Sequence, residues 1–257
     1  MTPSRRVSRR QFGIRGLQLL GVSLLTGCDV LSQSSWFAGL LERAEGLTRA
    51  VQKAIAPRLA LAREFAEADR SRVFPGNGTV DPSEPDYQAL AGTGFSAYRL
   101  EIGGLVERPA SFSLAELRSL PSRTQITRHD CVEGWSAIAK WKGVRLAALL
   151  ERVGVKPDAR YVVVHCFDAL REGGEKYYES LDLEDALHEQ TILAYDMNDH
   201  ALPVTNGAPL RLRVERQLGY KAAKYVRRVE LVERFDTIGQ GKGGYWEDRG
   251  YEWWAGI

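Results

Sequence analysis

The segment TRHDCVEGWS (residues 127–136) places one cysteine, Cys131, between a polar run and a Glu-Gly-Trp-Ser turn. A cysteine in the middle of a chain fills a core, forms half of a disulfide, attacks a substrate as a nucleophile or binds a metal. The residues around Cys131 must therefore decide both its role and the fold that surrounds it.

The composition is that of a soluble globular protein. Of the 257 residues, 44% are apolar and 26% are charged, which allows one large domain or two small ones with a sizeable core. The formal net charge of +2 becomes −3 without residues 1–28, because that segment holds five arginines and no acidic residue. No basic stripe remains, so a nucleic-acid partner is not expected.

The N-terminal segment 1–28 has the pattern of an export signal. Arg9 and Arg10 precede Phe12 and a short apolar run, which is typical of a twin-arginine signal and too short to span a bilayer. LTGC (residues 25–28) is typical of a lipoprotein processing site, so Cys28 is either acylated or removed with the signal. We therefore expect a periplasmic protein, with anchorage to the inner membrane through Cys28 as one alternative.

Export leaves Cys131 and Cys166 as the cysteines of the mature chain. Two cysteines in an oxidising compartment often form one disulfide, so a Cys131–Cys166 bridge is the simplest structural expectation.

The rest of the chain predicts an α+β fold. Apolar residues at helical spacing make residues 29–72 a helical spacer or arm, and a loop rich in Gly, Pro and Asp follows. Strands and short helices then alternate without a regular βαβ rhythm. The patterns predict strands at 97–107, 160–168, 191–198, 209–215 and 224–235, and helices at 113–120, 144–154 and 182–190. Cys131 is thus expected in a connection between two helices.

Two later segments have the character of an anion site. NGAPLRL (residues 206–212) places Asn206 and Arg211 around a turn that enters a strand, and LGYKAAKYV (residues 218–226) combines small residues with two lysines. Small residues that expose backbone N–H groups beside cations suit a phosphate-bearing ligand.

The order of these motifs resembles the sulfite oxidase-like family of molybdopterin oxidoreductases. CVEGWS is followed by WKGVRLAALL, then by LAYDMN and NGAPLRLRV, then by GYKAAKYV. The resemblance covers residues 73–235 and is strongest to the members that reduce protein-bound methionine sulfoxide. It implies a sulfite oxidase-type molybdopterin-binding domain and a two-electron oxygen-atom transfer, with sulfoxide reduction favoured over sulfite oxidation.

The resemblance also implies the site residues. Cys131 takes the place of the thiolate ligand to molybdenum, and Asn206 and Arg211 take the places of pterin contacts. The cofactor phosphate would lie against Ala222, Ala223 and Lys224. His165 stands where the family has a threonine that contacts the pterin, so the chain departs from the family there. A molybdenum ligand role for Cys131 replaces the disulfide as the favoured expectation.

Residues beside Cys131 are candidates for the substrate pocket. Arg128 and His129 can attract an anion or polarise a sulfoxide oxygen, or can lie on a solvated loop. Glu133 can move a proton or hold its loop by hydrogen bonding. Trp135 and Trp141 are expected in the core, whereas His188 and His200 are expected at exposed positions without a role.

The resemblance further implies a small sulfoxide or a protein sulfoxide as substrate and a haem-containing electron-transfer partner. A monomer is expected, because the residues beyond Phe235 leave no room for the dimerisation domain of sulfite oxidase. An exported binding lipoprotein without metal is the alternative from another class. The tail 236–257 holds Trp246, Trp253 and Trp254. It is expected to pack across the domain, with an aromatic lip over the cofactor or a docking surface as the alternatives.

Overall fold

The computed structural model describes residues 60–171 and 173–257, together with residues 34, 36, 37, 40, 44, 47, 48 and 51. Apart from Ser34, the described residues of the N-terminal stretch are helical, in agreement with a helical spacer. The proposed signal, residues 1–28, lies outside the described residues. None of the helices among the described residues has the length and hydropathy needed to cross a membrane.

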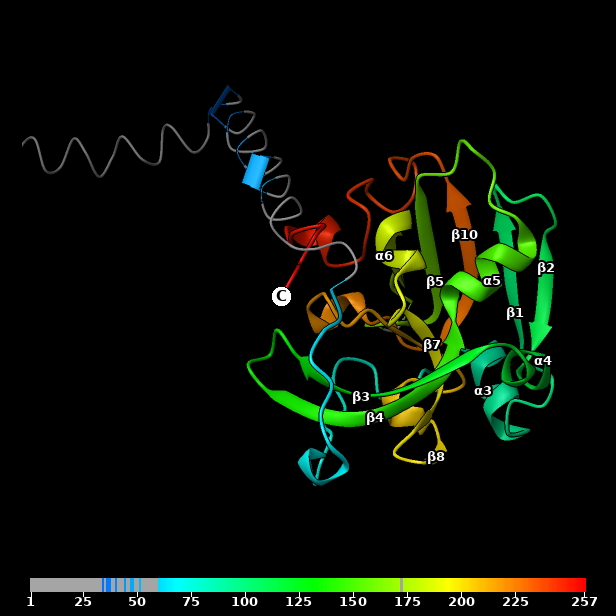
Figure 1. The fold of residues 1–257 in the computed structure, drawn as a ribbon. Helices are drawn as coiled ribbons and strands as arrows, with labels where there is room; N and C mark the ends of the chain where they lie inside the picture. The colour runs from blue at the N-terminus through cyan, green and yellow to red at the C-terminus, as the bar shows by residue number, and fades with distance from the viewer. Residues whose placement is uncertain are drawn as a thin grey trace, which may run out of the picture. The chain divides into compact units, whose positions relative to one another are not determined.

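Residues 58–257 form one compact unit around two β-sheets (Figure 1). In the first sheet β1 and β10 are parallel and the other neighbours are antiparallel. Its order is β2 (Ala110–Ser113), β1 (Arg99–Gly104), β10 (Val226–Val232), β5 (Tyr161–Ala169) and β6 (Lys176–Asp182).

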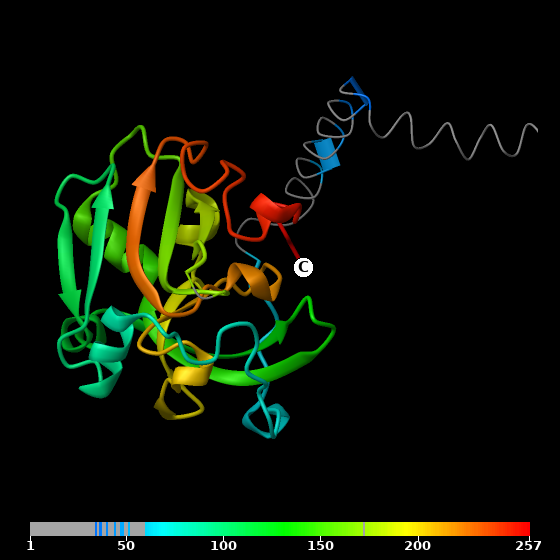
Figure 2. The same cartoon turned by 180° about the vertical axis from the view of Figure 1, so that it is seen from behind.

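The second sheet is antiparallel throughout, and its strand β9 pairs with β7. Its strands are β3 (Ser122–Asp130), β4 (Ser136–Arg145), β7 (Ile192–Met197), β8 (His200–Ala201) and β9 (Arg211–Arg213). The long β3–β4 hairpin projects from the body of the unit, as the green ribbon in Figures 1 and 2 shows.

The helices are short. They are α3 (Pro85–Gly92), α4 (Leu114–Ser119), α5 (Leu146–Val153) and α6 (Leu183–Leu187), with single 3-10 turns η1 (Glu67–Asp69), η2 (Val204–Asn206), η3 (Gly219–Lys221) and η4 (Glu247–Arg249). Helices α5 and α6 cover the same face of the first sheet (Figures 1 and 2). One mixed and one antiparallel sheet with few short helices confirm the predicted α+β class.

Local sequence explains the elements that were predicted. Ser113 caps α4, because its hydroxyl accepts from the Glu116 amide at 3.3 Å while the Glu116 carboxylate accepts from the Ser113 amide at 2.7 Å. Helix α5 buries Leu146, Leu149, Leu150 and Val153 on one face, and it ends at Gly154, whose φ of 72° suits glycine.

The prediction that Cys131 connects two helices is wrong. Cys131 follows the last residue of β3, and the turn after it leads into β4. The inward face of β3 carries the polar side chains of Gln125, Thr127 and His129, all at most 2% exposed. Because this face is buried and polar, β3 lacks the apolar alternation that marks a strand.

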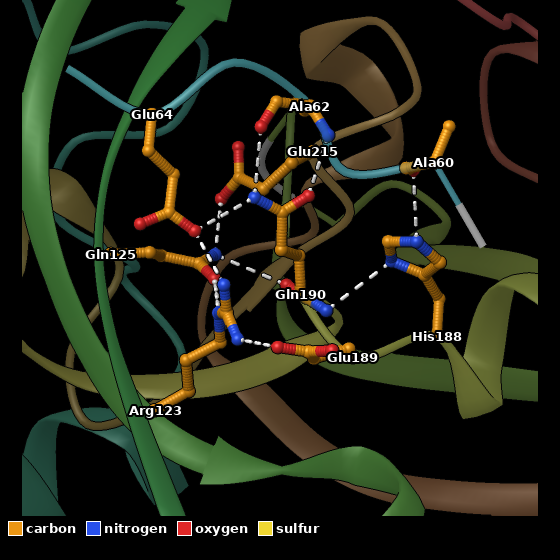
Figure 3. A network of polar contacts seen from close by, with 9 residues as sticks. All are labelled: Ala60, Ala62, Glu64, Arg123, Gln125, His188, Glu189, Gln190 and Glu215. Carbon is orange, nitrogen blue, oxygen red and sulfur yellow. Dashed lines mark hydrogen bonds and ion pairs between the residues drawn. The ribbon is translucent and has the colours of Figure 1, made fainter.

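The prediction that residues 29–72 are helical is also wrong for residues 60–66, which form an extended arm (Figure 3). The Gln190 side-chain amide accepts from the Ala62 amide at 2.7 Å and donates to the Ala62 carbonyl at 3.0 Å. The Phe65 amide donates to the Ile126 carbonyl of β3 at 2.9 Å. These tertiary hydrogen bonds override the helical spacing of the segment.

The tail packs into the unit, as expected. Tyr245 and Ala255 are 7% and 8% exposed, and the Trp253 indole N–H donates to the Ser180 hydroxyl at 2.7 Å. Its one regular element is η4, in agreement with the absence of a strand or helix period in its sequence.

Candidate functional site

Cys131 lies in the tight turn of the β3–β4 hairpin. Its amide donates to the Trp135 carbonyl at 2.9 Å, and its carbonyl accepts from the Gly134 amide at 3.0 Å. Gly134 has a φ of 88°, a conformation that favours glycine. Cys131 is 8% exposed, and burial raises the pKa of its thiol. Cys131 and Cys166 are both free thiols, so the disulfide alternative is excluded.

The Cys131 thiol opens into a cavity of about 190 Å³. Seven segments far apart in the sequence form its walls: the arm continuation at 77–79, the turn at 131–133, the end of β5, β6, β9, the segment 219–224 and the tail. The lining includes Asn77, Thr79, Cys131, Glu133, Asp168, Tyr177, Arg211, Ala222, Ala223, Lys224, Trp246 and Tyr251. The structure therefore brings Cys131, Glu133, Arg211, Ala222, Ala223 and Lys224 together, as the sequence predicts.

Arg211 supplies a buried cation to this cavity from β9. It is 1% exposed, and its guanidinium donates to the Asn206 carbonyl at 3.1 Å. Burial, followed by repulsion from Arg213, lowers the pKa of Arg211 to about 9. The Arg211 Nε and the Asn206 side-chain nitrogen are buried without a hydrogen-bond partner.

Lys224 supplies a second cation. Its ammonium donates to the carbonyls of Asn77, at 2.6 Å, and Thr79. Burial and the neighbouring Arg211 lower the pKa of Lys224 to about 7. Gly207 allows this approach, because a Cβ at that position would lie 2.9 Å from the Lys224 side chain. The glycine of NGAPLRL thus makes room for the lysine of GYKAAK.

The donors of this cavity fit an anionic cofactor with soft sulfur ligands. Two buried cations with lowered pKa values lie beside a thiol, and buried N–H groups of Arg211 and Asn206 have no partner. A bound anion would offset the cost of burying both charges and accept these hydrogen bonds. A thiolate is a suitable ligand for molybdenum.

Three predicted site residues, Asn206, Arg128 and His165, are not among the residues that line the cavity. Arg128 is on the other face of β3 from His129, with its side chain 55% exposed and paired with Asp130 at 2.9 Å. His165 on β5 contacts the Glu230 carboxylate at 2.9 Å and the Arg228 guanidinium at 3.1 Å. Neither residue lines the cavity. The roles assigned to Arg128 and His165 stay predictions.

His129 and His188 are both buried, and the exposed position expected for His188 is wrong. His129 is 2% exposed and its Nδ1 contacts the Arg213 guanidinium at 2.9 Å. Burial and the nearby arginines hold the pKa of His129 well below its usual range. His188 is 6% exposed and contacts the Ala60 carbonyl at 3.2 Å (Figure 3).

The sequence does not single out the lining residues Asn77 and Asp168. Asn77 lies in a segment that reads only as a loop, yet its side-chain nitrogen lies 3.9 Å from the Cys131 sulfur. Asp168 ends a buried strand, and burial raises its pKa to about 6. Trp246 and Tyr251 belong to the tail, whose lack of period gives no position for either ring. The aromatic content of the tail, with a lip over the cofactor as one alternative, is the one feature of the sequence that associated these two rings with the site.

Comparison with known proteins identifies the class. The model of the oxidoreductase molybdopterin binding domain family matches residues 89–237. The chain therefore belongs to this family, and the predicted resemblance is confirmed. It is a molybdopterin-binding oxidoreductase.

Individual relatives narrow the comparison. The chain is 37% identical over 249 residues to an Azospira oryzae protein provisionally named as protein-methionine-sulfoxide reductase subunit YedZ1, covering 97% of this chain and 88% of that one. It is 34% identical over 168 residues to the protein-methionine-sulfoxide reductase catalytic subunit of Xanthomonas axonopodis pv. citri, covering 62% of this chain. The match covers 51% of that subunit, so the chain spans about half of its length.

A solved structure is also similar. The sulfane dehydrogenase SoxCD from Paracoccus pantotrophus shares 27% identity at a TM-score of 0.49, over 54% of this chain and 39% of that chain.

Proposed function

We propose that the protein is an exported molybdenum enzyme that reduces a sulfoxide by two-electron oxygen-atom transfer, with protein-bound methionine sulfoxide as the substrate class. The observation that carries the proposal is the convergence of the Cys131 thiol with the buried cations of Arg211 and Lys224 on one cavity. The names of both relatives described above support the substrate class.

Different residues of the chain would hold different parts of the cofactor. Cys131 would bind molybdenum as a thiolate, while Asn206 and Arg211 would contact the pterin. Ala222, Ala223 and Lys224 would hold the phosphate. When bound, the molybdenum cofactor supplies the two-electron redox centre, and the protein supplies orientation and charge. A bound anion would raise the lowered pKa values of Arg211 and Lys224 and so stabilise their charged forms.

Two carboxyl groups at the cavity are suited to proton supply. Reduction of a sulfoxide to a thioether consumes two electrons and two protons and releases one water. Asp168, with its pKa raised to about 6, can hold a proton close to neutral pH. Glu133 lines the cavity and accepts from the Trp135 indole N–H at 3.1 Å, so it also anchors its own turn.

Metal content and activity of the exported protein test the proposal together. We expect about one molybdenum per chain, and reduction of a methionine-sulfoxide peptide with a reduced viologen as electron donor. Cys131→Ser should lose both, because a hydroxyl is a poor donor to a soft metal, while its thermal unfolding stays near wild type.

Three outcomes would contradict the proposal. Full activity of Cys131→Ser would exclude Cys131 as a ligand. A wild-type protein without molybdenum would favour the metal-free binding lipoprotein. Oxidation of sulfite with an artificial acceptor, without sulfoxide reduction, would favour a sulfite-oxidising enzyme.

The N-terminal predictions form a separate proposal. We infer export to the periplasm by the twin-arginine route, a lipid on Cys28 and a haem-containing electron donor. The pattern of residues 1–28 supports the first two, and the word subunit in the names of both relatives agrees with a partner protein. Substitution of both Arg9 and Arg10 by lysine should stop export, and Cys28→Ser should release the protein from membranes. Normal export of the double-lysine variant would contradict the twin-arginine route. Membrane attachment of Cys28→Ser would contradict the lipid on Cys28.

A further inference from the structure

The mouth of the cavity carries exposed apolar side chains. Val132 and Tyr251 are 42% and 39% exposed although both are large and hydrophobic, and both line the cavity together with Leu170 and Trp246. Exposed apolar groups beside a polar site indicate a surface that another molecule covers. The exposure of Val132 and Tyr251 places them at the entrance, where a substrate approaches.

Trp246 and Tyr251 form a preorganised aromatic pair on the tail. Their rings stack with centroids 5.2 Å apart, and the Tyr251 amide donates to the Trp246 carbonyl at 3.0 Å. Gly250, with a φ of 98°, turns the chain so that the two rings meet. The tail is itself fixed, because Glu247 pairs with the fully buried Lys221. Little ordering cost would therefore accompany binding at this pair.

The aromatic pair continues toward the Cys131 turn. Tyr251 packs edge-on against Tyr220 at 5.2 Å between ring centroids. Gly219, the neighbour of Tyr220, lies so close to the turn end of the hairpin that a Cβ there would be 2.9 Å from the Asp130 carbonyl. The rings thus lie on the wall that leads from the entrance to the thiol.

The charges at the entrance favour a neutral substrate over an anion. Glu133 is exposed and lines the cavity, whereas Asp168, Arg211 and Lys224, the other charged lining residues among those described, are buried. Arg128 is paired with Asp130 outside the cavity. A small oxyanion such as sulfite would be repelled by the Glu133 carboxylate on entry, whereas a neutral sulfoxide would not.

We propose that Trp246 and Tyr251 determine substrate specificity by packing against the thioether stem and S-methyl group of a methionine sulfoxide residue in a peptide. Sulfur and its methyl group pack favourably on aromatic rings, and an entrance with exposed walls admits a side chain that remains attached to its backbone. This inference rests on the proposed sulfoxide reduction. Both residues lie beyond residues 89–237, which match the family, so the proposed substrate contact belongs to the tail of this chain.

Steady-state kinetics with two neutral sulfoxides test the proposal. The molybdenum-loaded protein is assayed with a methionine-sulfoxide peptide and with dimethyl sulfoxide, using the same artificial reductant. Tyr251→Ala and Trp246→Leu should raise KM for the peptide by about 5- to 20-fold, because apolar contacts of this size discriminate substrates by about that factor. The kcat for the peptide and the kcat/KM for dimethyl sulfoxide should stay within about two-fold.

Trp253→Phe is the matched control. Trp253 lies in the same tail but stacks on Phe235 at 5.7 Å and does not line the cavity, so its loss should lower stability without changing KM. An unchanged KM for the peptide in both Tyr251→Ala and Trp246→Leu would overturn the inference. An equal fall in kcat/KM with both substrates, or a loss of molybdenum from Tyr251→Ala, would overturn it too. A loaded wild-type protein that reduces neither sulfoxide would instead overturn the proposed function.

Discussion

Arg211 and Arg213 neighbour each other on β9 but differ in what neutralises them. Arg213 forms a buried pair with Glu215 at 2.6 Å. Arg211 has a carbonyl as its hydrogen-bond acceptor, and burial lowers its pKa to about 9. An arginine that stays charged at neutral pH at such a cost is explained by an anion that binds there.

Replacement of Arg211 should therefore affect stability and cofactor binding in opposite directions. In the apoprotein, Arg211→Met should leave the free energy of unfolding unchanged or raise it by about 1–4 kcal/mol, because a hydrophobic group replaces a desolvated charge. The molybdenum retained after gel filtration should fall. Urea unfolding and metal analysis measure the two effects.

Arg213→Met is the control for this prediction. It leaves Glu215 buried without its partner and should destabilise the protein by about 3–5 kcal/mol. Equal destabilisation by both substitutions would show that Arg211 is an ordinary structural residue.

Asp168 should make the stability of the apoprotein depend on pH. Its pKa of about 6 lies above the usual value of 3.8, so the folded state binds its proton more tightly than the unfolded state. The destabilisation by the buried Asp168 carboxylate is greatest above pH 6 and disappears as the pH falls below about 4. Asp168→Asn should stabilise the apoprotein by about 3 kcal/mol at pH 7–8 and have no effect near pH 4. Urea unfolding across this range checks the sign, and a gain that is independent of pH would contradict it.

At the scale of elements, the extended arm depends on the residues after α6 (Figure 3). Gln190 is fully buried and makes both hydrogen bonds to the Ala62 backbone, in the manner of a neighbouring strand. The same segment then runs to Asn77 and Thr79, whose carbonyls hold Lys224. The arm therefore supports one wall of the cavity.

Removal of the Gln190 side chain should release the arm. Gln190→Ala should cost about 1–3 kcal/mol, because half-buried backbone groups of Ala62 lose their partners. Hydrogen exchange at the Ala62 amide should become at least about ten-fold faster. Glu189→Gln is the control, since the Glu189 side chain is 53% exposed in its ion pair with Arg123 and should contribute less than about 1 kcal/mol. Unchanged exchange at Ala62 would show that β3 alone holds the arm.

Elements with an apolar period or a local cap could be predicted from the sequence, and elements with polar buried faces could not. Helix α4 has its capping box, and β5 has a run of valines buried on both faces. Strands β3 and β6 instead bury Gln125, His129 and Glu179, whose partners come from distant segments. Periodicity carries no signal for such faces.

The same limit applies to the site. Cys131, Arg211 and Lys224 stand in motifs that could be recognised as an ordered set. Asn77 and Asp168 reach the cavity through contacts between segments far apart in the chain, and no local pattern specifies those contacts.

At the scale of the whole molecule, the tail joins the first sheet to the segment that contacts the cavity. Lys221 is fully buried between Glu179 of β6, at 2.6 Å, and Glu247 of the tail. Burial raises the pKa of Glu179 well above its usual range. The Trp253 ring stacks on Phe235 at 5.7 Å. Stability and closure of the cavity are therefore both tied to the same thirteen C-terminal residues, 245–257.

Deletion of residues 245–257 should lower the melting temperature by about 10–20 °C, because it removes buried aromatic rings and a partner of a buried ammonium. If the shortened chain does not fold, Trp253→Ala gives the same test on a smaller scale, with an expected loss of about 3–5 kcal/mol in urea unfolding. Tyr251→Ala, which removes a half-exposed ring, should cost much less than either change. A shortened chain with a normal melting temperature and normal turnover on an artificial reductant, but slow turnover with its physiological donor, would make the tail a docking surface for that donor instead. The buried positions of Tyr245, Glu247 and Ala255 favour the first result.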